Sequence, residues 1–109
     1  MKATLFAVVM FGIILSSASS QTGRAPSFQP KDGYVPTAET AVKIAEAILV
    51  PVYGEKQIAS ERPFKAVLQA DVWTVAGTLH CGAPACDGGT AEVKLSKTSG
   101  QILYMIHYK

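Results

Sequence analysis

The spacing of apolar and polar positions changes once along the chain, near Pro63. Before this point, TAETAVKIAEAILVPVYG repeats apolar residues at the spacing of one helical face. That face consists of Ala41, Ile44, Ala45, Ile48 and Val52, widened by Val42 and Leu49. Thr37 offers an N-cap hydroxyl, Pro51 ends or kinks the last turn, and Gly54 is a natural stop. We therefore expect one helix that begins after Thr37 and ends by Gly54.

After Pro63 the residues alternate, which is typical of half-buried strands. The alternation predicts strands at residues 64–70, 72–79, 90–96 and 101–108, with the turn KTSG joining the last two. The side chains expected on inward faces are Phe64, Ala66, Leu68, Trp73, Val75, Leu79, Ala91, Val93 and Leu95, whereas Ile102, Tyr104 and Ile106 share one face of the last strand. A helix followed by three or four meandering antiparallel strands predicts an α+β domain with one sheet face packed on the helix.

The first 20 residues have the order of a secretory signal peptide. Lys2 precedes an apolar run from Leu5 to Leu15, and the small residues Ala18 and Ser20 fit a cleavage site before Gln21. The run is too short for a membrane span, which needs about 20 apolar residues. We expect export to the periplasm or the extracellular space, with no membrane contact after cleavage. Residues 21–36 are expected to be a flexible leader, ordered at most near Tyr34 and Val35, and residues 37–109 a single α+β domain.

The charge balance narrows the choice of partners. Ten Lys and Arg residues against eight Asp and Glu give a formal net charge of +2, and the basic residues do not cluster. Nucleic-acid binding is therefore not expected. The charged residues Glu55, Lys56, Glu61 and Arg62 are expected to form a solvated connection between the helix and the first strand.

The loop HCGAPACDGG, residues 80–89, contains the only two cysteines. An even count in an exported chain favours a disulfide between Cys81 and Cys86, which would reinforce a small core. A metal site is the alternative, with His80, Cys81, Cys86 and Asp87 as ligands. Its four ligands would all come from one short loop, and His80 and Cys81 would point to opposite faces of a strand. We expect no metal ion and no cofactor.

Catalytic residues do not stand out in the sequence. Ser60 or Ser96 would have to supply the nucleophile of a triad, but neither follows a strand at a sharp turn into a helix. Asp71 and Glu92 are the available carboxylates for acid and base work, although a carboxylate at a strand end or beside Lys94 is more often solvated. We therefore do not expect an enzyme.

Residues 34–109 resemble the bacterial nuclear-transport-factor-2-fold immunity proteins. The matching pieces are the helix TAETAVKIAEAIL, the phrase VPVYGEKQI, the strand openings RPFKA and DVWTVAGTL, the hairpin GGTAEVKLSK and the ending SGQILYMIHYK. The resemblance implies one helix packed on a curved sheet of three to four antiparallel strands, a reduced form of the nuclear-transport-factor-2-like or cystatin-like fold. It also implies a non-catalytic protein that binds and neutralises a cognate bacterial toxin.

A partner would be bound by the exposed sheet face or by the loops at the sheet end. The candidate contact residues are Thr74, Thr78, Glu92, Lys94 and His107, together with the loop Cys81–Gly89. Two alternatives stay open: an inhibitor of an extracytoplasmic hydrolase or a small envelope binding module, and an enzyme of the same superfamily with Asp71 as its base.

Overall fold

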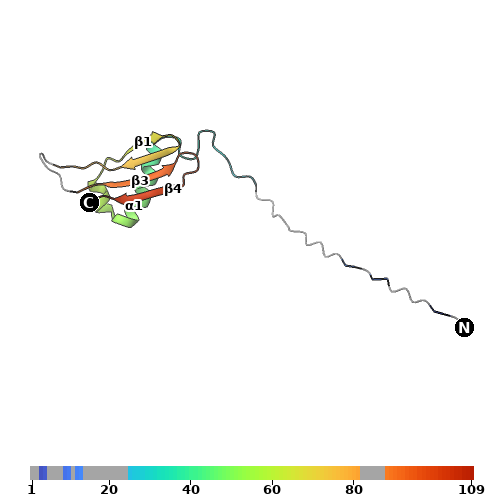
Figure 1. Cartoon of the computed structure of the whole chain (residues 1–109). Coiled ribbons are helices and arrows are strands. Elements are labelled where there is room, and N and C mark those ends of the chain that lie inside the picture. Colours follow the sequence, from blue (N-terminus) through green and yellow to red (C-terminus); the bar gives the residue numbers. More distant parts are fainter. Residues whose placement is uncertain (1–2, 5–8, 11, 14–24, 82–87) are drawn as a thin grey trace.

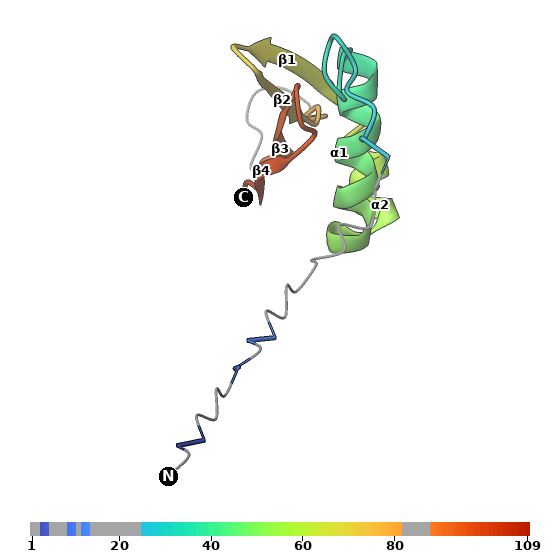
Figure 2. The same ribbon diagram turned by 90° about the vertical axis from the view of Figure 1, so that its right-hand side faces the viewer.

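The described part of the chain folds into two helices and four strands in the order ααββββ (Figure 1). The computed structural model describes residues 3–4, 9–10, 12–13, 25–81 and 88–109. The strands form one antiparallel sheet in the order β1-β2-β3-β4, and both helices lie on the same side of it (Figure 2). A helix packed on a four-stranded meander is the predicted α+β architecture, so the expected fold class is confirmed.

Helix α1 spans Ala38–Tyr53 and has the predicted limits. The Thr37 side chain accepts a hydrogen bond of 3.2 Å from the Thr40 N–H, which satisfies one of the free amides of the first turn. At the other end the N–H of Gly54 donates to the Val50 carbonyl, and the φ of Gly54 is 91°, a conformation that favours glycine. Pro51 lies inside the helix without ending it.

Helix α2, Glu55–Ser60, was not predicted. It begins directly after Gly54 and buries Ile58 completely, while its other residues face outward. Because only one of the six residues of α2 is buried, the sequence has no periodic apolar pattern that would predict this helix. Of the four charged residues expected to be solvated here, Glu55, Lys56 and Arg62 are exposed, whereas Glu61 is buried, so the expectation is wrong at Glu61.

The sheet consists of β1 Lys65–Gln69, β2 Val72–Ala76, β3 Ala91–Ser96 and β4 Ile102–His107. Ala70 and Asp71 form the tight turn between β1 and β2, with Ala70 at a φ of 54°. Strand β2 ends three residues earlier than predicted, and Leu79, expected to point inward, is exposed. Leu68 is exposed as well, although it shares the helix-facing side of β1 with the half-buried Ala66.

A register shift between Lys94 and Leu95 also corrects the prediction for β4. Tyr104 pairs with Lys94 and Ile106 with Glu92, on the side away from the helices, whereas Ile102 pairs with the buried Leu95. The irregularity adds one residue to β4, so Ile102 does not follow the alternation of Tyr104 and Ile106.

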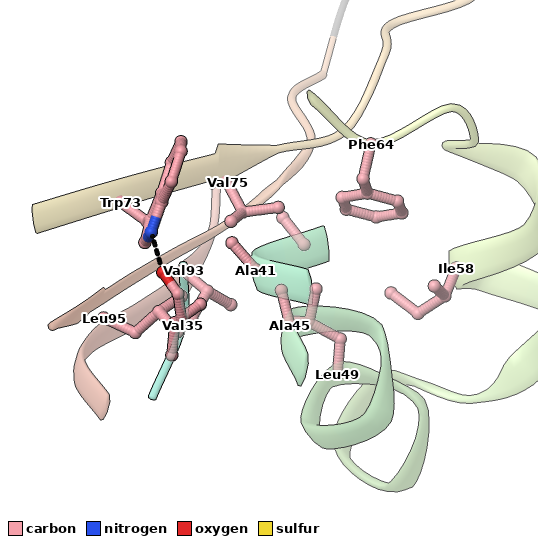
Figure 3. Packing of buried hydrophobic residues seen from close by; sticks show 11 residues of the cluster. Val35, Ala41, Ala45, Leu49, Ile58, Phe64, Trp73, Val75, Val93 and Leu95 are labelled. Atoms are coloured by element: carbon pink, nitrogen blue, oxygen red, sulfur yellow. Dashed lines mark hydrogen bonds between the residues drawn. The ribbon is translucent and has the colours of Figure 1, made fainter. Parts of the chain in front are cut away.

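The core fills the space between α1 and the sheet (Figure 3). Its fully buried members from the helix are Ala41, Ala45 and Leu49, and those from the sheet are Val75, Ala91, Val93 and Leu95. The small alanines let the helix approach the sheet closely. Val35, which precedes the predicted domain boundary, belongs to this core and is 1% exposed.

Hydrogen bonds fix the segment before α1 to the sheet. The indole N–H of Trp73 donates to the Val35 carbonyl over 2.8 Å (Figure 3). The N–H groups of Tyr34 and Val35 donate to the carbonyls of Thr98 and Lys97 in the β3–β4 turn. Gly33, at a φ of 84°, passes so close to the Lys97 carbonyl that a side chain would not fit. These contacts close one end of the core.

Candidate functional site

The sheet has one side that neither helix covers. Strand alternation places on it the side chains that point away from the core, and two of their cross-strand rows run over all four strands. We call these eight residues the open face: Val67, Thr74, Lys94 and Tyr104 in one row, and Lys65, Ala76, Glu92 and Ile106 in the other. Thr74, Glu92 and Lys94, three of the candidate contact residues, are thus brought together.

The open face combines apolar area with charge. Val67 is 66% exposed and Tyr104 is also exposed, while the Lys94 ammonium lies 5.9 Å from the centre of the Tyr104 ring, within the range of a cation–π contact. At its edge the Tyr108 hydroxyl donates to a Glu92 carboxylate oxygen over 2.8 Å. That bond, together with Tyr104, raises the pKa of Tyr108 to about 12. Tyr108 therefore stays a hydrogen-bond donor at neutral pH.

Thr78 and His107 do not belong to the open face. The Thr78 backbone N–H donates to the Glu61 carbonyl and its hydroxyl to the Pro63 carbonyl. His107 pairs with the buried Ala91 on the helix side, and its ring centre lies 5.3 Å from that of Tyr53. Both side chains are held by internal contacts, so the five candidate residues do not form one surface.

The most constrained polar group is the carboxylate of Glu61, which is 4% exposed. One oxygen accepts from the Ala91 N–H over 2.6 Å, and the other lies 3.0 Å from both the Gln57 amide nitrogen and the His107 Nε2. Burial alone would raise the pKa of Glu61, but these hydrogen bonds and the attraction to His107 lower it. Glu61 thus joins α2 to β3 and β4 as an ionised group.

Two of the residues considered for catalysis, Asp71 and Ser96, join the β1–β2 and β3–β4 turns instead. The Asp71 carboxylate accepts from the hydroxyls of Thr98 and Ser96, at 2.6 and 3.0 Å, and the Thr98 bond is the main cause that lowers the pKa of Asp71. A lowered pKa makes this group a weaker base. Glu92 lies in β3 opposite Ala76, the last residue of β2, whereas Asp71 precedes the first residue of β2. The two carboxylates therefore lie at opposite ends of β2 and are not a pair. The hydroxyl of Ser60 donates to the Gln57 carbonyl.

The cysteine loop lies largely outside the described residues. Cys81 is described and Cys86 is not, so the disulfide stays a prediction. The His80 ring nitrogen lies 2.6 Å from the Arg62 carbonyl. The described part of the chain contains no group of three or more His, Cys, Asp or Glu side chains placed to hold a metal ion. None of the helices described has the length and apolar content needed to cross a membrane.

A hollow of about 400 Å³ lies over the outward side of α1. It is lined by Lys43, Glu46, Ala47, Val50, Pro51 and Arg62. Arg62 bonds to Glu55 over 2.9 Å and to Glu46 over 2.7 Å, which ties the two helices together and raises the pKa of Arg62. Asp71 is not among its lining residues, so this hollow offers no substrate site beside that carboxylate.

Comparison with known proteins gives one positive result. Residues 40–109 match the model of a family described as NTF2 fold immunity protein. The searches of curated proteins and of solved structures returned no match. The matched range contains all four strands and nearly all of α1, and the helix-on-sheet architecture fits this fold. The chain therefore belongs to the NTF2-fold immunity protein family.

Proposed function

We propose that this protein is an exported immunity protein that binds a cognate toxin through the open face and neutralises it by covering part of the toxin's surface. Membership of an immunity protein family supports toxin neutralisation in general, and such families are typically non-enzymatic. The signal-peptide pattern of residues 1–20 supports a toxin that acts outside the cytoplasm.

The observation that carries this proposal is the arrangement of the open face. Both helices lie on the other side of the sheet (Figure 2). The eight side chains therefore project from a backbone that the core holds rigid. A rigid surface loses little conformational entropy on binding. Its apolar side chains supply contact area, and Lys65, Lys94 and Glu92 supply a charge pattern that a partner can complement.

The open face alone is too small for a stable complex. The open face measures roughly 17 by 19 Å, because its strands have five to six residues and four strands lie side by side. A standard interface uses about 800 Å² from each partner, which is more than this area provides. We therefore expect the contact to extend to Leu79 and Tyr108, which are exposed beyond the ends of β2 and β4 at the same end of the sheet.

Reversing the charge of Lys94 should weaken toxin binding. Lys94 is exposed at the centre of the open face, so Lys94→Glu should raise the dissociation constant about 30-fold or more, equivalent to about 2 kcal/mol. The measurement is calorimetric titration with the toxin encoded beside this protein, and survival of cells that express both. Lys56→Glu makes the same charge change on the exposed side of α2 and should leave the affinity within about twofold of the unchanged protein.

Two results would contradict this proposal at different levels. If the unchanged protein neither protects cells nor binds the neighbouring toxin, toxin neutralisation by this route is wrong, and inhibition of lysozymes, amidases or proteases would then favour the hydrolase inhibitor. If Lys56→Glu weakens binding as much as Lys94→Glu, the toxin does not use the open face.

A further inference from the structure

Strand β4 is an outer strand of the sheet (Figure 1), and the residues along it are mostly apolar. In the sheet formed by the described residues it pairs with β3 only, so the backbone N–H and C=O groups of alternate residues have no strand partner. Its stretch from Ile102 to Ile106 contains no charged side chain. Leu103 is 50% exposed, and Ile102, Tyr104 and Met105 are exposed as well.

The opposite edge of the sheet is built differently. Strand β1 begins with Lys65 directly after Phe64 and Pro63, and it ends with Gln69 before the Asp71 turn. Lysine on an edge strand and proline beside it are common devices that prevent pairing with another chain. Helix α1 also packs against β1, β2 and β3. Strand β4 contains neither lysine nor proline, its described contact with α1 is the ring pair of Tyr53 and His107, and its register shift lies toward β3. An apolar edge without such charges is normally selected against unless something pairs with it.

We propose that β4 pairs in an antiparallel manner with β4 of a second copy of this chain, which joins the two sheets into one of eight strands. The absence of charged side chains between Ile102 and Ile106 favours a second copy of β4 as the partner strand. Any antiparallel register that pairs residues 102–106 with the same residues of another copy sets no like charges opposite one another. A charged partner strand would find no counter-charge along this edge, and a formal net charge of only +2 opposes self-association weakly.

The pairing would be isologous, with the same strand contributed by both copies around a two-fold axis. A two-fold axis perpendicular to the sheet keeps both open faces on the same side. The pairing therefore goes beyond the proposed function: it uses an edge that the open face does not need, and it would present two toxin-binding surfaces side by side.

Sedimentation equilibrium of the full chain, processed by the cell that expresses it and measured without any toxin, tests the pairing. The unchanged protein should reach a dimer as its concentration rises. Leu103→Lys places a charge on the β4 edge and should raise the dimer dissociation constant at least about tenfold. Val67→Lys makes the same change at a 66% exposed apolar position on β1 and should leave dimerisation unchanged.

Hydrogen exchange of the unchanged protein provides a second readout that needs no variant to fold. Amides of β4 should exchange more slowly as the dimer forms, whereas amides of β1 should not change. A chain that stays monomeric at every concentration would overturn the proposal. So would a dimer that Leu103→Lys leaves intact, or one that Val67→Lys weakens equally. None of these measurements involves the toxin, so they fail or succeed independently of the proposed function.

Discussion

Replacing Glu61 with glutamine should lower the midpoint of thermal unfolding by about 10–20 °C, because it disrupts the most buried polar cluster that the structure describes. The carboxylate accepts from Ala91, Gln57 and His107. A glutamine amide has only one acceptor oxygen, and its NH₂ group would face donors that already point inward. Leaving buried donors unpaired should reduce the free energy of unfolding by about 2–4 kcal/mol. Calorimetry or circular dichroism measures the midpoint.

The same substitution should change how stability depends on pH. The folded-state pKa of Glu61 lies below its usual value of 4.5, so the folded protein binds this proton less readily than the unfolded chain does. Its contribution is therefore complete above about pH 4.5 and is lost as the pH falls through the folded-state pKa. Glu61→Gln should flatten the stability curve in this acidic range, since glutamine does not titrate.

Two controls isolate the effect of Glu61. Asp71 also has a lowered pKa and contributes in the same direction, so the pH dependence of Glu61→Gln is compared with that of Asp71→Asn. Glu55→Gln removes an exposed carboxylate that pairs with Arg62, and its midpoint should stay within a few degrees of the unchanged protein. A Glu61→Gln midpoint equally close to that of the unchanged protein would show that the carboxylate cluster does not hold the fold.

The elements that the sequence predicts correctly are those whose burial repeats locally. Helix α1 has a cap at Thr37, a stop at Gly54 and a periodic apolar face between them. Strand β3 alternates the buried Ala91, Val93 and Leu95 with outward residues. The same alternation placed Thr74, Glu92 and Lys94 on the outward side, and these three do lie together on the open face. Alternation is a property of one strand, so it needs no knowledge of distant contacts.

The features that the sequence does not predict depend on distant parts of the chain. Glu61 is buried because its carboxylate meets groups 30 and 46 residues away, at Ala91 and His107. Nothing in the neighbouring residues distinguishes it from the exposed Arg62. Val35 is buried because Trp73 and the β3–β4 turn hold its backbone. Tertiary bonds of this kind leave no period in the sequence.

Helix α1 contains one position where its periodic pattern predicts burial correctly and one where it does not, and comparing the two gives a direct test. Leu49 and Val52 were both placed on its apolar face, but Leu49 is fully buried and Val52 is 56% exposed. In the last turn the neighbouring Tyr53 packs against the core, with its ring 5.3 Å from that of His107 in β4. Val52 is not among the residues that pack against the core.

Leu49→Ala should consequently destabilise the protein far more than Val52→Ala does. Removing a fully buried leucine side chain loses its apolar burial and leaves a cavity among Ala45, Ile58 and the sheet, which costs about 2–5 kcal/mol. Val52→Ala removes exposed methyl groups and should change the free energy of unfolding by about 0.5 kcal/mol or less. Urea unfolding measures both, with equal slopes as the check that neither variant alters the unfolded state. Equal losses at the two positions would mean that α1 lies against the sheet along its whole length, and that the helix face inferred from periodicity alone was right at Val52.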